Sequence, residues 1–241
     1  MKYFELLSTR TKYLNKINNQ DKILYFPLID IKKYHLECFL NKIYKIKSIN
    51  IFIFISKNAI ECIMPIIKKN FEHYKRFKYI SIGNSSAKEI QKYGIKNIYY
   101  SNSKYPNSNE ILKLKILKEV KNKKIIIFKG NDGNRLLYDI LRKRQAIVHN
   151  VISYKREKPS LEKNIFPIKN NVFKFTLITS VENLKNFFFF MNSFTYSKIF
   201  FYKYIIVTSY KIKKMARFLG FRHIILSNTY KETEILVNIK K

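Results

Sequence analysis

Short apolar runs alternate with amphipathic, helix-like stretches along most of this sequence. A short apolar run between polar turns is typical of a buried strand, whereas apolar residues spaced three or four apart indicate a helix. The run at 124–128 is almost continuously apolar, as in a strand that is covered on both faces of a parallel sheet. We therefore expect strands at 49–55, 79–82, 98–100 and 124–128, and helices at 57–69 and 135–143.

Individual residues mark the boundaries of these elements. Pro65 is expected to bend the helix at 57–69, because proline lacks an N–H donor. Ser85 can cap the helix that follows the strand at 79–82, and Gly94 stands where a helix end favours a left-handed residue. The alternation of strands and helices predicts an α/β fold of doubly wound parallel sheets.

An internal repeat relates residues 51–112 to residues 175–236. Four matches follow in the same order and at nearly the same spacing. They are Ser56 with Ser180, Gly94 with Gly220, Ser101-Asn102 with Ser227-Asn228, and Glu110-Ile111-Leu112 with Glu234-Ile235-Leu236. Such a repeat predicts two domains of the same architecture.

The repeat also locates the domains. Each repeated segment forms a sheet that lacks one strand–helix unit, and two such units remain elsewhere in the chain. We assign residues 124–144 to the middle segment and the unit at 4–18 to the C-terminal segment. The expected domains are 1–26 with 157–241 (discontinuous) and 31–151, joined by linker strands at 27–30 and 152–156. The polar loops at the carboxyl ends of the strands are then expected to face a common cleft, where ligands bind in open α/β sheets.

The net charge of +32 invites a nucleic-acid reading, but only eight of the 48 basic residues are Arg. Proteins that read bases or grip phosphates favour Arg, because its planar fork matches those acceptors. The abundance of Lys, Asn, Ile, Phe and Tyr is typical of A+T-rich coding sequences. We therefore expect no nucleic-acid partner, although a basic surface still attracts small anions.

Other function classes find little support in the composition. Cys38 and Cys62 lack the spacing of a metal site or a disulfide framework, and the four histidines are scattered. The apolar run Phe187–Phe190 is flanked by Lys185 and Lys198, so we interpret it as the core face of a helix rather than a membrane span. With no signal-peptide layout at the N-terminus, we expect a cytoplasmic monomer without metal or organic cofactor and without a membrane partner.

Six loops are candidates for ligand binding, because each lies where a strand gives way to a helix. Unpaired backbone N–H groups and the helix dipole favour an anion at such a position. The loops are Ser8-Thr9-Arg10, Ser56-Lys57-Asn58, Gly83-Asn84-Ser85-Ser86, Lys129-Gly130-Asn131-Asp132-Gly133-Asn134, Thr179-Ser180 and Thr208-Ser209. Plain helix capping by the same side chains remains an alternative for each loop.

Two features need separate interpretation. The segment Gly130–Gly133 lacks the GKS or GKT ending of a phosphate-binding loop, and its glycines are expected to let the backbone approach a ligand closely. Tyr154 lies on an expected linker strand, where its phenol can hydrogen-bond a leaving hydroxyl group. A tyrosine that merely packs between two domains remains the alternative.

These motifs together resemble the uroporphyrinogen-III synthase family over nearly the whole chain. The loop Ile55–Ile60 resembles the family's "TSxNAV" loop, with Ile178-Thr179-Ser180 as the second copy, and Ile82–Ala87 resembles its "IGxxTA" turn. Phe128–Leu137 is similar to its "RGxGGRxLL" segment, and Thr9-Arg10 to its opening turn. Val151–Arg156 resembles the linker strand that carries the family's active-site tyrosine, here Tyr154.

The resemblance implies two flavodoxin-like domains joined by a two-stranded linker, with a cleft between them. The implied activity is that of a cyclising hydro-lyase of haem and sirohaem biosynthesis, which converts hydroxymethylbilane to uroporphyrinogen III with inversion of ring D and loss of water. No metal or organic cofactor is implied. The expected catalytic residue is Tyr154, and the expected substrate-binding residues are Thr9, Arg10, Ser56, Asn58, Gly83, Asn84, Ser85, Ser86, Lys129, Gly130, Asn131, Gly133, Thr179, Ser180 and Ser209.

The sequence departs from the family pattern at some positions. Lys129 stands where the family has Arg, Lys57 replaces Pro or a polar residue, and the loop at 207–212 lacks a usual Gly and paired Thr. The alternative hypothesis is a non-enzymatic two-domain binding protein for a small polycarboxylate anion.

Overall fold

The computed structural model describes residues 2–10, 22–34, 49–103, 106–133, 135–159, 171–193, 203–229 and 231–239. Several positions named above lie outside these residues, namely 11–18 of the N-terminal unit, Cys38, Asn134 and Lys198, and so does one of the four histidines, His35. The chain divides by its contacts into two compact units. Unit 1 consists of Met1–Asp30 with Glu157–Lys241, and unit 2 of Ile31–Arg156.

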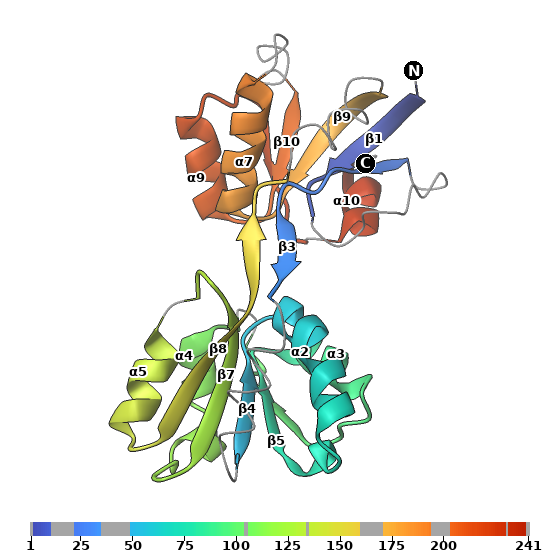
Figure 1. Cartoon of the computed structure of the whole chain (residues 1–241). Helices are drawn as coiled ribbons and strands as arrows, with labels where there is room; N and C mark the ends of the chain where they lie inside the picture. The colour runs from blue at the N-terminus through green and yellow to red at the C-terminus, as the bar shows by residue number, and fades with distance from the viewer. Residues whose placement is uncertain are drawn as a thin grey trace. The chain divides into compact units, whose positions relative to one another are not determined.

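Unit 1 is built on a five-stranded sheet in the order β11-β10-β9-β1-β2, and the four strand pairs are all parallel. Its N-terminal strand β1 therefore lies inside the sheet, between β2 and the much later strand β9 (Figure 1). The strands are β1 (Lys2–Ser8), β2 (Ile23–Tyr25), β9 (Asn171–Ile178), β10 (Tyr204–Val207) and β11 (Ile224–Leu226), and the helices are α7 (Val181–Asn192), α9 (Tyr210–Phe218) and α10 (Glu232–Ile239).

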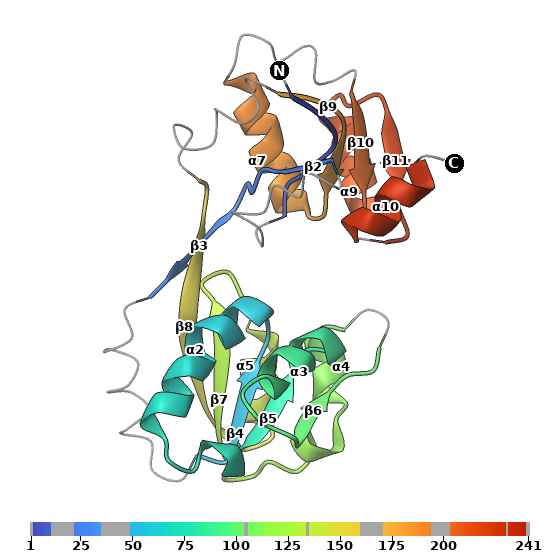
Figure 2. The same cartoon turned by 90° about the vertical axis from the view of Figure 1, so that its right-hand side faces the viewer.

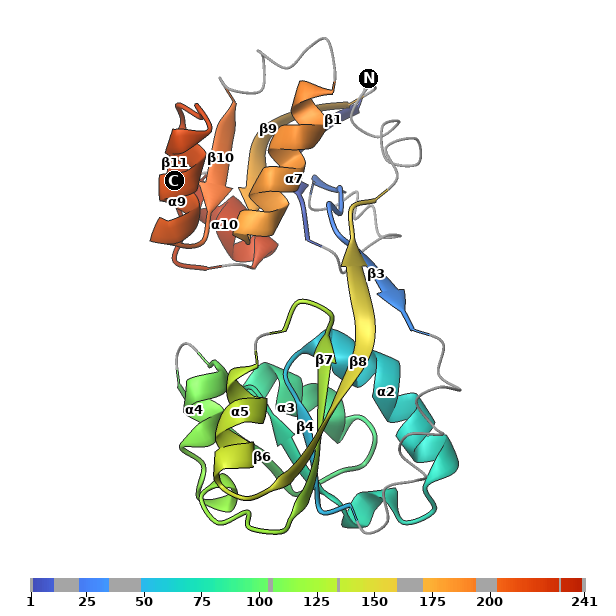
Figure 3. The same cartoon turned by 60° about the vertical axis from the view of Figure 1, so that its left-hand side comes forward.

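Unit 2 is built on a six-stranded sheet in the order β3-β8-β7-β4-β5-β6. The pairs from β8 to β6 are parallel, whereas β3 runs in the opposite direction to β8 beside it (Figure 3). The strands are β3 (Asp30–Lys33), β4 (Ile51–Phe54), β5 (Lys78–Ser81), β6 (Ile98–Tyr100), β7 (Lys124–Gly130) and β8 (Ile147–Glu157); the helices are α2 (Lys57–Asn70), α3 (Asn84–Gln91), α4 (Ser108–Leu112) and α5 (Leu136–Lys143), with short 3₁₀ turns at Tyr74–Arg76 and Lys115–Leu117.

The two sheets have the same strand arrangement. The order β2-β1-β9-β10-β11 in unit 1 corresponds to β8-β7-β4-β5-β6 in unit 2. The N-terminal strand β1 therefore corresponds to β7, which is the correspondence that the internal repeat predicts. The prediction of an α/β fold with parallel sheets is confirmed.

Helices cover both faces of each sheet. In unit 2, α2 and α3 pack on one face over Phe52, Phe54 and Phe128, while α4 and α5 pack on the other over isoleucines such as Ile53 and Ile127. In unit 1, α7 and α9 cover one face and α10 covers the other (Figures 1 and 2). Alternate residues of each central strand therefore face different helices, and both faces are apolar because neither meets water.

Most boundaries follow the sequence signals. The helix predicted at 57–69 is present with Pro65 inside it, and Gly94 has a φ of +76°, the left-handed conformation expected at a helix end. The cap predicted at Ser85 is wrong, because α3 begins at Asn84 and its N-cap is Gly83. The apolar run Phe187–Phe190 lies in α7, as expected. No helix within the described part of the chain is long and apolar enough to span a membrane.

Candidate active site

Polar residues follow the carboxyl ends of three neighbouring strands in unit 2. Ser56 comes after β4, Gly83 after β5, and Gly130 ends β7. Because these strands are parallel, their carboxyl ends meet at one edge of the sheet. Tyr154 on β8 pairs with Gly130 and joins the same edge. The sequence-predicted residues of this unit therefore lie along one sheet edge.

Ser56 connects the start of α2 with Tyr154. It is the N-cap of α2, and its Oγ accepts a hydrogen bond of 3.1 Å from the backbone N–H of Ala59. The same Oγ lies 3.0 Å from the phenol oxygen of Tyr154. Helix capping and contact with Tyr154 are therefore combined in one hydroxyl group, and neither excludes the other. Asn58 follows in the first turn of α2 and is half-buried.

Tyr154 is almost fully buried, with 4% of its surface exposed. Its backbone carbonyl accepts a hydrogen bond of 3.1 Å from Asn131 N–H, and Asn131 Oδ1 accepts one from the backbone N–H of Arg156. A Cβ atom at Gly130 would lie 2.8 Å from Tyr154 Cζ. The phenol ring thus rests directly on the backbone of Gly130, whereas the sequence led us to expect a ligand close to this glycine.

Lys129 is a buried basic residue in the same loop. Its Nζ donates a hydrogen bond to the backbone carbonyl of Gly133, and its exposed fraction is 7%. Burial, and secondly the nearby charge of Arg135, lower the pKa of Lys129 below its ordinary value. The lysine therefore closes the loop from Lys129 to Gly133 while carrying a charge at the sheet edge.

The loop after β5 is held by small residues. The Ser81 hydroxyl donates to the carbonyl of Gly83 at 3.1 Å, and a Cβ atom at Gly83 would lie 2.7 Å from the ring of Pro106. Of the three residues that follow Gly83, Asn84 and Ser85 are exposed and Ser86 is buried.

The carboxyl edge of the unit 1 sheet carries two further cap serines. Ser180 caps α7 by accepting from Asn183 N–H at 3.0 Å, and Ser209 caps α9 by accepting from Ile212 N–H at 3.4 Å. Both are half-buried, as is Thr179. The capping interpretation holds for these two serines, and both lie at helix N-termini where an anion is favoured.

The Ser8-Thr9-Arg10 turn ends β1 at the same edge of unit 1. Thr9 is fully buried, and its hydroxyl donates to the carbonyl of Leu177 at 2.8 Å. Its side chain is therefore directed into the sheet, and its backbone N–H also donates to the carbonyl of Leu177 at 3.3 Å, so Thr9 fixes the turn from inside. Arg10 is 27% exposed at its side chain and forms an ion pair of 2.9 Å with Glu232.

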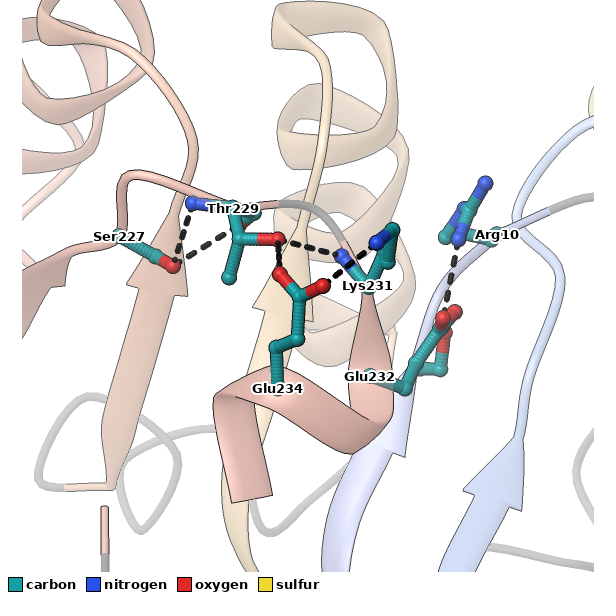
Figure 4. A network of polar contacts seen from close by, with 7 residues as sticks. Arg10, Ser227, Thr229, Lys231, Glu232 and Glu234 are labelled. Carbon is teal, nitrogen blue, oxygen red and sulfur yellow. Dashed lines mark hydrogen bonds and ion pairs between the residues drawn. The ribbon is translucent and has the colours of Figure 1, made fainter. Parts of the chain in front are cut away.

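Glu232 joins this turn to the start of α10, as Figure 4 shows. Its other carboxylate oxygen accepts a hydrogen bond of 3.0 Å from Ser8 Oγ. On the preceding loop, Thr229 accepts from Lys231 N–H and donates to Glu234 at 2.6 Å. Hydrogen bonds therefore fix both the β1 turn and the loop that leads into α10.

Sequence reasoning missed three polar residues of the unit 1 edge: Ser8 as a partner of Glu232, Glu232 itself, and Asn183. Asn183 Nδ2 donates to the carbonyl of Thr9 at 3.3 Å, and its buried Oδ1 has no hydrogen-bond partner among the described residues. The only local signal for Glu232 was its place in the first turn of a helix, where acidic residues are favoured, and α4, α5 and α7 share that feature. Its contact with β1 had no local signal, because 222 positions separate it from Arg10.

The site residues thus form two sets, each at the carboxyl edge of one sheet. In the described ranges, no group of three or more His, Cys, Asp or Glu is arranged to hold a metal ion. What the edges share is helix N-termini capped by serine, together with one basic side chain, and unit 2 adds a buried phenol.

The fold and the two sheet edges place this chain in a class of α/β proteins. In this class, parallel sheets carry helix N-termini that are suited to bind anions. A family model described as uroporphyrinogen-III synthase HemD matches residues 20–236. The chain belongs to the uroporphyrinogen-III synthase family, whose members are cyclising lyases of tetrapyrrole biosynthesis. The resemblance seen in the sequence motifs is confirmed.

Individual relatives agree with this assignment. A uroporphyrinogen-III synthase of Proteus mirabilis is 30% identical over 132 residues, which span 54% of this chain and 66% of that protein. The crystal structure of the Helicobacter pylori enzyme covers 99% of this chain and 100% of its own at 14% identity, with a TM-score of 0.65. A mutant enzyme of Thermus thermophilus covers 98% and 97% at 11% identity, with a TM-score of 0.59. The two structures show a shared fold.

Proposed function

We propose that this chain is a uroporphyrinogen-III synthase, a hydro-lyase that cyclises hydroxymethylbilane to uroporphyrinogen III in haem and sirohaem biosynthesis. The observation that carries the proposal is the family match over residues 20–236. The reaction inverts ring D and releases one water molecule. The alternative, a non-enzymatic binding protein for a small polycarboxylate anion, is not favoured by a family match of this extent.

The reaction requires few catalytic side chains, so the main task of the protein is to hold the substrate in one geometry. Loss of the hydroxyl group from ring A leaves a reactive azafulvene, and the substituted carbon of ring D attacks it to form a spiro intermediate that rearranges before closure. Holding the two ends of the linear chain together accelerates such a step by proximity and orientation. The catalytic side chain that we propose is Tyr154, whose phenol donates a hydrogen bond or proton to the departing hydroxyl group.

The substrate carries several acetate and propionate groups, and the two sheet edges are suited to bind them. Helix N-termini favour carboxylates through their unpaired N–H groups and the helix dipole, and Arg10 and Lys129 add positive charge at the edges. The proposed binding residues are Thr9, Arg10, Ser56, Asn58, Gly83, Asn84, Ser85, Ser86, Lys129, Gly130, Asn131, Gly133, Thr179, Ser180 and Ser209. Among these, Thr9 is fully buried with its hydroxyl bonded to Leu177, so in our proposal it contributes by fixing the turn that carries Arg10.

We also propose two flavodoxin-like domains, 1–26 with 157–241 and 31–151, joined by linker strands at 27–30 and 152–156. The strand order in unit 1 supports this, because β2-β1-β9-β10-β11 is the 2-1-3-4-5 order of flavodoxin-like folds. Strand β8 continues without a break to Glu157, so residues 152–156 are the second half of a long strand. A cytoplasmic monomer without nucleic-acid or membrane partners completes the proposal, and light scattering tests the monomer.

A coupled assay tests the activity. Freshly generated hydroxymethylbilane is supplied to the purified protein, and the products are oxidised and separated as uroporphyrin isomers. The expected result is isomer III above the isomer I that forms spontaneously. Isomer I alone, from protein shown to be folded by circular dichroism, would contradict the proposal and favour the anion-binding alternative. Heat-denatured protein is the control.

A further inference from the structure

The direction of the Tyr154 side chain depends on an irregularity in strand β8. The pairing of β8 with β7 shifts between Lys129 and Gly130, so that Gly130 pairs with Tyr154. Ser153 is therefore an extra residue in β8. Side chains alternate between the two faces of a regular strand, and a bulge re-aims those that follow it. Val151 and Tyr154 would face opposite sides of a regular strand, but here both pack in the core beneath α2 and α3.

Gly130 provides the space that the re-aimed ring occupies. A Cβ atom at this position would lie 2.8 Å from Tyr154 Cζ and 3.0 Å from its Oη. Real Cβ atoms are not found so close to other heavy atoms, so only glycine allows this arrangement without a shift of the ring. The bulge and the glycine together bring the phenol oxygen to the start of α2.

At that point the phenol meets the hydroxyl group of Ser56. A serine hydroxyl has one proton to donate and lone pairs to accept with. Ser56 Oγ already accepts from Ala59 N–H at 3.1 Å, and its proton is available for Tyr154 Oη at 3.0 Å, a pair in which either oxygen can donate. When Ser56 donates, the phenol proton of Tyr154 is directed to a third atom rather than to Ser56.

Among the described residues of unit 1, the cap serine Ser180 has no tyrosine partner of this kind. Ser180 caps α7 in the same way that Ser56 caps α2. Strand β2, which corresponds to β8 of unit 2, continues into Phe26–Leu28. This segment is apolar and buried, and it packs against α7. The serine–phenol pair is therefore a feature of unit 2 beyond the duplicated capping pattern.

We propose that Ser56 is a positioning residue that acts through Tyr154, by donating its hydroxyl proton to Oη and leaving the phenol proton for the hydroxyl group that departs from the substrate. This inference rests on the proposed function. The pyrrole nitrogen of ring A supplies the electron pair that breaks the C–O bond, and the oxygen leaves with the phenol proton as water. The proton that ring D loses when it regains aromaticity after closure restores the phenol.

The test compares Ser56→Ala, Ser56→Thr and Tyr154→Phe with the double variant S56A/Y154F. We measure kcat, KM and the melting temperature of each. Loss of one hydrogen bond that acts in the transition state predicts a fall in kcat of about tenfold for Ser56→Ala. The KM is expected to change by less than about twofold, because the backbone N–H donors of this loop remain to bind substrate. Ser56→Thr keeps a hydroxyl at the cap and is expected to retain kcat. In the Tyr154→Phe background, Ser56→Ala is expected to lower kcat no further.

Asn107→Ala is the matched control for the lost helix cap. Asn107 is exposed and caps α4 in the same unit by accepting from two backbone N–H groups. Its replacement is expected to lower the melting temperature to a similar degree and to leave kcat unchanged. A Ser56→Ala effect of equal size with and without the Tyr154 hydroxyl would overturn the inference, as would an unchanged kcat. Isomer I alone from the wild type would instead contradict the proposed function, and this role with it.

Discussion

Arg10 and Lys129 occupy equivalent positions in the two sheets. The strands that carry them, β1 and β7, each pair with a strand that leads to a cap serine, Ser180 or Ser56. In unit 1, Ser8 pairs with Leu177, three residues before Ser180, and Arg10 lies two residues after Ser8. In unit 2, Ile127 pairs with Ile53, three residues before Ser56, and Lys129 lies two residues after Ile127. Each sheet edge therefore presents one cation beside a helix N-terminus, although the sequence retains different residues at the two positions.

This equivalence predicts similar effects when either charge is removed. Arg10→Met and Lys129→Met are each expected to raise the KM for hydroxymethylbilane about tenfold and to change kcat by less than about threefold, because a carboxylate contact worth about 1.4 kcal/mol is lost in ground state and transition state alike. Steady-state kinetics at fixed salt measure both constants. Lys121→Met is the control, because this exposed lysine lies at the amino end of β7. A fall in kcat with an unchanged KM would show that the charge acts on the chemistry instead.

The Glu232 carboxylate predicts a stability effect that is specific to unit 1. Glu232→Gln is expected to lower the free energy of unfolding by about 2 kcal/mol, because it weakens charged hydrogen bonds from Arg10 and Ser8 to a residue that is only 8% exposed. Urea denaturation measures the loss, and hydrogen exchange is expected to locate it in β1 and α10. Glu110→Gln, which breaks the more exposed pair with Lys113, is expected to cost less than about 1 kcal/mol. Equal losses in the two variants would argue against a special role for Glu232.

The contact between Gly130 and Tyr154 predicts a steric coupling. Gly130→Ala is expected to lower stability by about 1–3 kcal/mol, because the new Cβ forces the buried ring to move. In a Tyr154→Ala background the same change is expected to cost less than about 1 kcal/mol, since the ring is gone. Gly133→Ala provides a comparison, because its Cβ would meet the flexible end of Lys129. A cost at Gly130 that is the same with and without the ring would contradict this interpretation.

His149 on β8 predicts a pH dependence of stability. Burial, then the charges of Lys124 and Arg142, lower the pKa of His149 below its ordinary value of 6.5. The unfolded chain therefore binds more protons than the folded chain between the lowered pKa and 6.5, and stability falls as the pH drops through this window. His149→Gln is expected to lessen the fall in melting temperature between about pH 7.5 and about pH 5.5. His73→Gln, at an exposed position, is expected to keep the wild-type dependence; an unchanged slope in His149→Gln would refute the prediction.

The sequence predicted the elements whose signals are local. The apolar run at 124–128 forms a strand in the structure, because apolar residues of this kind are buried. Gly94 marks a helix end, because glycine readily adopts the left-handed conformation found there. Ser56 and Ser180 were recognisable as ends of equivalent strands, because capping requires a short polar side chain just before a helix. The cap at Ser85 was predicted wrongly, because Gly83, two residues earlier, is the N-cap and the helix begins at Asn84.

The contacts that shape the site were beyond prediction, because they depend on pairing between distant segments. The bulge at Ser153 exists only in the register of β8 against β7, and nothing in the residues around Ser153 marks it. The ion pair of Arg10 with Glu232 likewise requires that α10 pack on the face of β1. The sequence could name Tyr154 as a candidate, but its direction toward Ser56 came from this non-local register.

Strand β1 has a consequence for how the protein is made. Leu6 pairs with Phe175, so β1 leaves the ribosome long before its neighbour β9 is synthesised. Unit 2 is continuous from Ile31 to Arg156, and domains generally fold as units in the order of synthesis. The middle of the chain is therefore expected to fold first, while the edge of β1 that pairs with β9 remains unpaired and accessible to chaperones until β9 emerges.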